Sequence, residues 1–235
     1  MNHPTAPIKD AHDGAEHYCF TIRRRFTHPA LSVSLDAKAA EALAELVPLL
    51  CCGEEAAVVS FDRLGRAASL DVVACRTLRK IADDERRHDA ILRGLCAALP
   101  ASSLDRAVQH RARHFHLSLP RGGTLLHLAR IAGLDAAVCT ILSRLLRPGV
   151  PISRDQGVSA VLTHIRKDET RHVMVSRGIA LAAADRQAVR NAAAEARGAL
   201  AELLTCGADA FEALGIDPDR LMLDIKRLPD GLLPQ

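Results

Sequence analysis

Apolar residues recur along most of this chain at the three- and four-residue spacing that one face of an α-helix requires. Over residues 35–64 this spacing predicts one long helix, capped by Ser34, kinked or restarted at Pro48, and ended by Gly65. Further helices are predicted over residues 69–98, 103–115, 124–146, 154–183, 185–214 and 219–227. No segment alternates apolar and polar residues over the length of a strand, so we expect an all-α chain.

The helical pattern divides the chain into three parts. Residues 1–34 show little periodicity and are predicted to be an N-terminal tail with at most one short helix. Residues 35–183 hold four long helices, which we expect to form an antiparallel four-helix bundle. Residues 184–235 are predicted to be additional C-terminal helices that pack on this bundle.

Composition agrees with a helical protein. The chain has 235 residues, of which 49% are hydrophobic and only 3% aromatic, and this favours helices over sheets. The 31 basic and 28 acidic residues give a formal charge of +3, which is too balanced to indicate a nucleic-acid partner. The longest basic run, residues 23–25, is expected to be solvated or to bind a tail.

The seven cysteines indicate a reducing compartment. Their number is odd and no Cys-x-x-Cys occurs, so neither a disulfide framework nor a zinc ribbon is predicted. We expect a cytoplasmic protein without a signal peptide. No run of about 18 apolar residues is found, so no membrane partner is expected either.

One five-residue pattern, Asp-Glu-x-x-His, occurs twice. The copies are Asp84–His88 and Asp168–His172, 84 residues apart. By chance the pattern should occur about 0.04 times in a chain of this composition, so the repeat is a real excess. A Glu and a His three residues apart lie on one helix face, where both can bind one metal ion.

The other two long helices each supply one further carboxylate. Glu54 lies on the apolar face of the 35–64 helix, where a carboxylate is costly unless it is paired or binds metal. Its neighbour Glu55 points about 100° away and is the weaker candidate. Asp135 is the only acidic residue between Leu117 and Arg154. Four carboxylates and two imidazoles make an oxygen-rich site suited to iron or manganese.

This pattern resembles the ferritin-like di-iron carboxylate superfamily over about residues 40–180. Residues 53–61 resemble its first-helix motif, and residues 167–172 resemble the last ligand helix of its aldehyde-deformylating and N-oxygenating members. The resemblance implies a ferritin-like four-helix bundle that binds two Fe ions, with Mn or a mixed Mn/Fe pair as the alternative. The implied metal ligands, which are also the catalytic residues, are Glu54, Glu85, His88, Asp135, Glu169 and His172.

The resemblance also implies roles for two residues that touch no metal. Asp84 is expected to orient His172, and Asp168 to orient His88, which would fix the tautomer of each imidazole. The chain departs from the usual pattern at Asp135, where most members have Glu. The shorter side chain requires either a closer approach of the backbone or a weaker hold on one metal.

Among the activities of this superfamily, the sequence favours oxygen activation. A rubrerythrin would carry Cys-x-x-Cys, and a radical-generating subunit would carry a Tyr where this chain has Leu92; the only Tyr is Tyr18. We therefore expect an O₂-dependent di-iron oxygenase or oxidase that oxidises a small organic substrate, by N-oxygenation or C–H oxidation. Its expected partners are a ferredoxin-type electron donor and a second copy in a homodimer.

A substrate pocket is expected about one helical turn from the ligands. The expected lining residues, with ordinary core packing as the alternative, are Cys51, Val58, Ile81, Ala132, Cys139 and Ile165. His164 lies one position away from a third histidine ligand of N-oxygenases and is interpreted as a surface or supporting residue. The histidines of the 101–120 connection, at 110, 114 and 116, are expected to be solvated, with a second metal site as the alternative.

Two rival classes stay open. One is a non-catalytic metal-binding or iron-handling ferritin-like protein. The other is a helical interaction module in which the repeated motifs are salt-bridged helix turns. Metal content separates the module from the other two, and turnover with oxygen separates an enzyme from a store.

Overall fold

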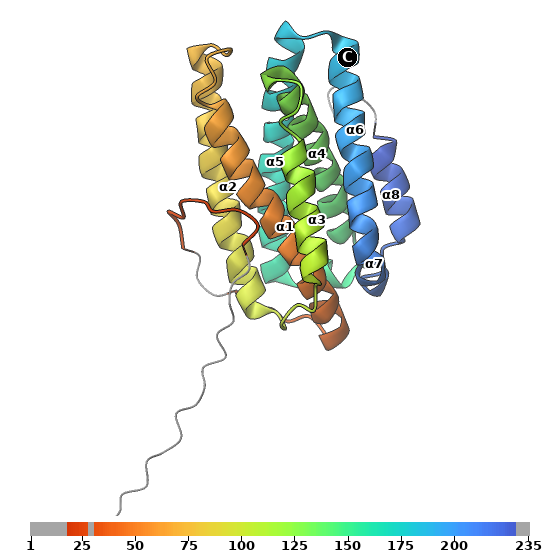
Figure 1. Cartoon of the computed structure of the whole chain (residues 1–235). Helices are drawn as coiled ribbons and strands as arrows, with labels where there is room; N and C mark the ends of the chain where they lie inside the picture. The colour runs from red at the N-terminus through yellow and green to blue at the C-terminus, as the bar shows by residue number, and fades with distance from the viewer. Residues whose placement is uncertain (1–17, 28–30, 229–235) are drawn as a thin grey trace, which may run out of the picture.

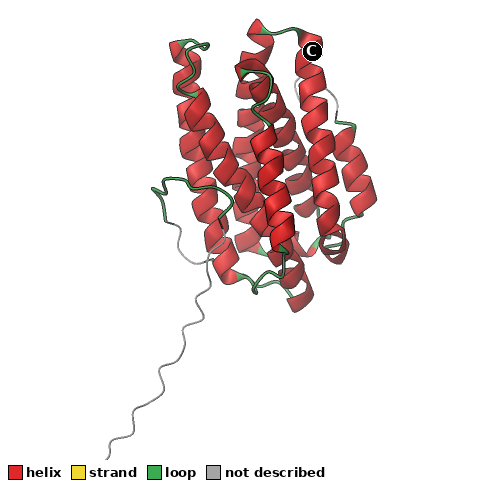
Figure 2. Ribbon diagram, viewed as in Figure 1, coloured by secondary structure: helices red, strands yellow, loops and turns green. Residues whose placement is uncertain are grey.

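The described part of the chain, residues 18–27 and 31–228 of this computed structural model, is helical and contains no strand (Figure 2). The prediction of an all-α chain is therefore confirmed. The elements are α1 (Ala37–Leu64), α2 (Val72–Ala98), α3 (Arg106–Ser118), α4 (Thr124–Leu145), the 3₁₀ turn η1 (Pro151–Arg154), α5 (Gln156–Ala183), α6 (Arg186–Leu204), the 3₁₀ turn η2 (Thr205–Gly207), α7 (Ala208–Ala213) and α8 (Pro218–Lys226).

Aspartates start most of these helices. The carboxylate of the residue before each helix accepts a backbone N–H of its first turn in α1, α2, α3, α5, α6 and α8. Such a cap satisfies amide donors that the helix itself leaves free. The prediction that Ser34 caps α1 is wrong, because Asp36 does so. Ser34 instead donates its N–H and Oγ–H to Asp155, the cap of α5.

Two helix predictions need correction. Pro48 lies inside α1 and does not divide it, although it removes one backbone donor. The single helix predicted over residues 185–214 is interrupted by η2. There Gly207 packs on Leu46, and a Cβ at this position would lie 2.8 Å from Leu46 Cδ2. The chain therefore turns at Gly207 and continues as the short α7.

The helices pack as two hairpins joined side by side. α1 lies along α2, α4 lies along α5, and α2 contacts α5 (Figure 1). α3 packs across α1 and reaches α6, which lies along α4, while α8 packs on α6. One large core cluster contains residues from α1, α4, α5, α6 and α8, so the C-terminal helices share the apolar interior of the preceding ones.

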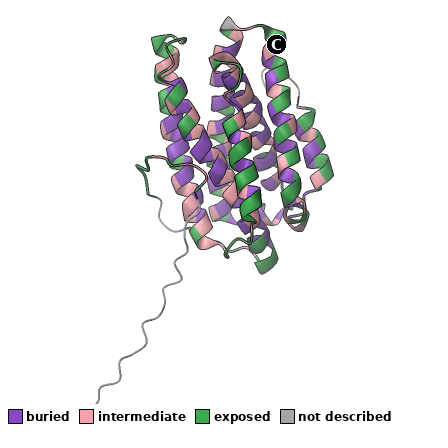
Figure 3. Cartoon of the chain, viewed as in Figure 1, coloured by how far each residue is buried: buried purple, intermediate pink, exposed green. Residues whose placement is uncertain are grey.

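Burial follows this arrangement, with buried positions facing inward and exposed positions on the outer helix faces (Figure 3). α4 is the one helix in the described ranges that is long and apolar enough to cross a membrane. However, 67% of its apolar window is buried against neighbouring helices. This burial is what a core helix of a soluble protein shows.

Part of the predicted tail lies outside the described residues, at positions 1–17 and 28–30. The described part, residues 18–27, forms no helix and packs against α1 and α2. Within it, Arg24 contacts Glu55 at 2.8 Å and Asp89 at 3.2 Å. The expectation that residues 23–25 are solvated or bind a tail does not hold for Arg24, which pairs with carboxylates of α1 and α2.

Candidate metal centre

Four of the six predicted ligands meet at one point in the interior. Glu54 of α1, Glu85 and His88 of α2, and Glu169 of α5 each offer a donor atom, and these atoms all lie within 4.8 Å of one another. All four side chains are buried. The Nδ1 atom of His88 faces the carboxylates, at 3.2 Å from Glu85 and 3.4 Å from both Glu54 and Glu169.

The other two predicted ligands lie beside this group. His172 is fully buried, and its Nδ1 atom lies 2.9 Å from Glu85 and 3.7 Å from Glu169. Asp135 of α4 lines the same pocket as three of the glutamates. Glu85 and Glu169 therefore stand between two sets of donors, Glu54 with His88 on one side and Asp135 with His172 on the other.

Helix geometry produces this arrangement. In each repeated motif the Glu and the His are three residues apart and so lie on one face of α2 or α5. Because α2 contacts α5, the two faces meet, and the His88 and His172 rings lie 5.9 Å apart between centroids. α1 and α4 then add one carboxylate each from the remaining sides.

Outside the ligand cluster, each histidine contacts an aspartate of the opposite helix. His88 Nε2 lies 3.3 Å from Asp168 Oδ2, and His172 Nε2 lies 3.5 Å from Asp84 Oδ2. The structure thus brings together the same crossed pairs that the resemblance implied. Arg171 connects the two aspartates, at 2.8 Å from Asp84 and 3.0 Å from Asp168.

Proton affinities in the cluster are strongly shifted. Burial raises the pKa of Glu54 and of Asp135 well above its usual value, and nearby carboxylates raise both further. Burial also opposes ionisation of Glu85, but the two imidazoles outweigh it and lower that pKa. Burial alone would lower the pKa of each histidine. The facing carboxylates instead raise the pKa of His88 well above its usual value, and that of His172 to about 12.

The side chains of this cluster are better suited to binding a metal ion than to binding protons alone. Oδ2 of Asp135 is buried and has no hydrogen-bond partner. Nδ1 of His172 also makes no hydrogen bond, although a Glu85 oxygen is 2.9 Å away. Unpartnered polar atoms are rare in protein interiors and need an explanation. A cation bound between these atoms would satisfy both of them.

A pocket of about 80 Å³ reaches this cluster from the side of α3 and α6. One water needs about 10–15 Å³ of such volume, so the pocket has room for a small organic group. Carboxylates form its inner wall, at Glu54, Glu85, Asp135 and Glu169, and the rest is mostly apolar, with Leu49, Leu50, Ile131, Leu134, Val138 and Ile141 from α1 and α4 and Leu200, Leu203 and Leu204 from α6. None of the six residues expected to line a substrate pocket lines this one; all six are buried in the core, as the alternative of ordinary core packing predicted.

The position of His116 differs from the sequence-based expectation. It was expected to be solvated, but it is buried on α3 and lines the pocket. Burial lowers its pKa to about 4, so it is neutral at pH 7. The amphipathic pattern of residues 106–118, with buried Val108, Ala112 and His116 four residues apart, is the signal that could have found it.

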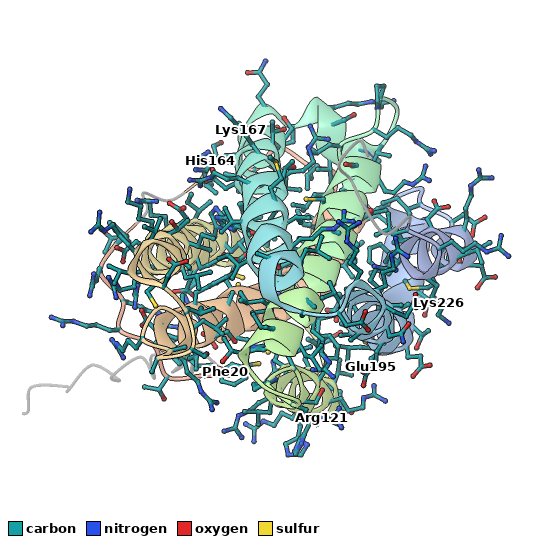
Figure 4. All side chains as sticks on the ribbon, turned by 90° about the horizontal axis from the view of Figure 1, so that it is seen from above. Phe20, Arg121, His164, Lys167, Glu195 and Lys226 are labelled. Carbon is teal, nitrogen blue, oxygen red and sulfur yellow. The ribbon has the colours of Figure 1, made fainter. Side chains whose placement is uncertain are left out.

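Of the remaining candidates, His164 lies beside the cluster, because its donor atom and those of His88 and Asp168 are all within 4.8 Å of one another. His164 projects from the outer face of α5, where its side chain is half exposed and 3.7 Å from Asp168 (Figure 4). His110 and His114 are exposed on α3, with 3.2 Å between their Nε2 atoms. Glu55 is buried but faces the N-terminal segment, where it pairs with Arg24 and Arg93.

Comparison of the chain with models of protein families, with curated proteins and with solved structures found no match. The class of the protein therefore follows from its own residues. It is an all-helical protein with a buried cluster of glutamates and histidines that could hold a metal ion.

Proposed function

We propose that this protein is a ferritin-like di-iron enzyme that uses dioxygen to oxidise a small, largely apolar organic molecule. The observation that carries this proposal is a buried group of four carboxylates and two imidazoles that opens onto an apolar pocket. A metal centre used for storage or for structure does not need such a pocket. An enzyme does, because the substrate must reach the metal in order to be oxidised.

The six residues divide naturally between two ions. Glu54 and His88 would hold one ion, Asp135 and His172 would hold the other, and Glu85 and Glu169 lie within reach of both. Four carboxylates balance the charge of two divalent ions, and hard oxygen donors with two imidazoles suit iron or manganese. When bound, iron(II) supplies the electrons that activate dioxygen, and an external donor of the ferredoxin type restores them.

The chain itself orients the site and keeps it dry. Asp168 forms a hydrogen bond with Nε2 of His88, and Asp84 lies 3.5 Å from Nε2 of His172, so both Nδ1 atoms point toward the carboxylates. The leucines of α1, α4 and α6 exclude water from the pocket, and they select a substrate with little polar surface. His116, which is neutral at pH 7, and Ser60 are polar groups of the pocket wall within reach of such a substrate.

Metal content tests the site. Purified protein should bind up to two iron or manganese ions per chain, and Glu85→Ala should remove most of this metal because Glu85 contacts both histidines. Glu195→Ala is the matched control, since Glu195 is an exposed glutamate of α6 (Figure 4). Wild-type metal content in Glu85→Ala would show that the cluster is not the metal site.

Reaction with oxygen tests the enzyme. Anaerobic protein loaded with iron(II) is mixed with oxygenated buffer, while dissolved oxygen and iron oxidation are followed by electrode and absorbance. We expect oxidation within seconds, and repeated oxygen consumption when a reductant and an apolar substrate are present. Ferric mineral growing beyond two irons per chain would favour the iron-handling alternative instead, and iron(II) that stays unreacted would reject the oxygenase proposal.

A further inference from the structure

A second pocket, of about 100 Å³, adjoins the pocket at the metal centre, and we call it the outer pocket. The two pockets share three lining residues, Ala56, Ser60 and His116, so these side chains stand between them. The remaining residues of the outer pocket are Phe20, Val59, Arg63, Leu117, Pro120 and His127. A cationic and a neutral polar side chain thus lie just beyond the largely apolar cavity at the metal centre.

His127 has a buried nitrogen atom that lacks a partner. The residue is only 3% exposed and lines the outer pocket, and its Nε2 atom has no hydrogen-bond partner among the described residues. Burial lowers the pKa of His127 to about 4, and the cationic Arg63 and Arg130 lower it further, so the ring is neutral at pH 7. Unpartnered polar atoms are rare in protein interiors. An acceptor atom bound in the outer pocket would satisfy a proton on Nε2.

The surroundings of His127 favour an acceptor with negative charge. Arg63 is exposed and makes no ion pair or side-chain hydrogen bond with the described residues, because its neighbour Asp62 pairs with Arg86. α4 begins at Thr124 without a side-chain cap from the described residues, whereas aspartates cap most of the other helices. The free N–H groups of this first turn, which includes His127, add partial positive charge. The outer pocket is therefore suited to an anion.

The outer pocket lies at a defined height above the metal centre. Arg63 follows Glu54 by nine residues in the α1 region, which corresponds to about 13 Å along a helix. His127 precedes Asp135 by eight residues on α4, which corresponds to about 12 Å. The two polar groups thus stand equally far from the carboxylates that α1 and α4 contribute to the metal centre. A ligand held by both groups reaches the metal centre only with its far end.

We propose that the outer pocket binds the carboxylate of an apolar carboxylic acid, whose hydrocarbon body extends through the adjoining pocket to the metal centre. This inference rests on the proposed function and names the substrate class. The planar guanidinium of Arg63 donates two parallel hydrogen bonds to the carboxylate. Nε2–H of His127 donates a third, which gives the buried nitrogen its missing partner.

Charge determines the orientation of this acid. The pocket at the metal centre is walled by four carboxylates, which disfavour an additional anion, whereas Arg63 attracts one. The leucines of α1, α4 and α6 contact hydrocarbon without loss of hydrogen bonds. The acid therefore presents carbon atoms, and not its carboxylate, to the metal centre.

Binding to the whole metal-free protein tests the proposal without any oxygen chemistry. Dissociation constants of octanoate and of its uncharged analogue 1-octanol are measured by isothermal titration calorimetry at pH 7. We expect one octanoate per chain, bound roughly tenfold more tightly than 1-octanol, because hydrogen bonds to a charged group are the stronger ones. Equal affinities for the two molecules would overturn the proposal.

Substitutions locate the carboxylate. Arg63→Gln and His127→Leu should each weaken octanoate binding by about tenfold, and Arg63→Gln should leave 1-octanol binding unchanged. Arg66→Gln is the matched control, since Arg66 is an exposed arginine just beyond the end of α1 that does not line the outer pocket. Wild-type octanoate affinity in Arg63→Gln, or an equal loss in Arg66→Gln, would contradict the assignment. Circular dichroism confirms that every variant is folded.

The orientation of the acid has its own readout. Bound manganese(II) broadens the NMR signals of nearby protons, and this effect falls steeply with distance. In manganese-loaded protein the terminal methyl group of octanoate should broaden more than the methylene beside its carboxylate. The reverse order would show that the carboxylate binds the metal and would reject the proposal. Because the calorimetry needs neither metal nor oxygen, octanoate binding without any reaction with oxygen would reject the di-iron function and not the carboxylate site.

Discussion

Both metal-facing imidazoles contact an aspartate on the side away from the carboxylates. Hydrogen bonding from His88 holds the pKa of Asp168 at about 2, and the pKa of Asp84 is lowered by His172 and Arg87 although burial opposes this. Both aspartates are therefore ionised at pH 7, and each faces the Nε2 atom of one ring. When a metal takes the place of the Nδ1 proton, each ring would keep its other proton on Nε2, facing the aspartate.

We predict that these aspartates determine metal affinity although they contact no metal. Asp168→Ala and Asp84→Ala should each weaken iron(II) affinity by about 10- to 100-fold, because the ring loses its orienting acceptor. Competition with a colorimetric chelator measures this. Asp83→Ala is the matched control, since Asp83 precedes Asp84 on α2 but pairs with Arg86 and Arg25. Equal affinities in all three variants would show that the aspartates are only surface charges.

Individual site residues could be predicted from the sequence where a residue type is chemically unusual for its position. Glu54 and Asp135 stood on apolar helix faces, and the repeated motifs placed each Glu beside its His. The burial of Glu55 could not be predicted in the same way. Its partner Arg24 lies in an N-terminal segment without periodicity, and no local pattern shows that this segment returns to α1.

At the scale of helices, the contact between α4 and α6 decides how the pocket is closed. Gly133 of α4 lies two residues before Asp135, and a Cβ there would be 2.6 Å from the Ala193 carbonyl oxygen of α6. The absence of a side chain at Gly133 thus lets the two backbones approach. This approach places the leucines of α6 over the pocket beside Asp135.

Replacing this glycine should separate the two helices. Gly133→Ala is predicted to destabilise the protein by about 1–3 kcal/mol, because the clash is with backbone that cannot rotate away. Gly198→Ala on α6 is the control, since no atom lies within 4 Å of a Cβ there. That substitution should stabilise the protein by roughly 0.5–1 kcal/mol through helix propensity. Urea unfolding followed by circular dichroism gives both values, and equal effects would contradict the close approach.

The positions of helices were easier to predict than their contacts. Periodicity and breakers such as Pro148–Pro151 located the ends of α1, α2, α4 and α5 to within three residues, whereas the helix predicted over residues 185–214 ends at Leu204. The residues that line the pocket were not predicted because part of its wall comes from α3 and α6. These two helices pack on α1 and α4 but do not belong to the four long helices expected to form the bundle. Long-range packing of this kind leaves no signal in the spacing of residues along either helix.

At the scale of the whole molecule, the metal-free protein holds protons where the loaded protein would hold cations. His88 and His172 have raised pKa values because they face carboxylates, and Glu54 and Asp135 have raised pKa values chiefly because they are buried. Protonation of all four groups therefore stabilises the folded metal-free state. Metal binding must displace protons held by these groups, and we expect proton release when metal is loaded.

This exchange predicts opposite effects of pH on the two forms. A folded pKa of about 12 for His172, against an ordinary value of 6.5, gives stabilisation that is complete below about pH 6.5 and is lost as pH rises. The raised pKa values of Glu54 and Asp135 act in the same direction. The lowered pKa of Glu85 acts in the opposite direction, but only at acid pH.

The melting temperature of metal-free protein should therefore fall between about pH 6.5 and pH 9. The melting temperature of protein loaded with iron(II) or manganese(II) should hold or rise over the same range, because proton competition for the ligands decreases and bound metal stabilises the folded state. Thermal unfolding with and without metal, in anaerobic buffers of equal ionic strength, measures both curves. In Glu85→Ala the curve with metal should follow the metal-free one. Parallel curves for the wild-type protein would mean that the buried histidines are not the groups that metal deprotonates.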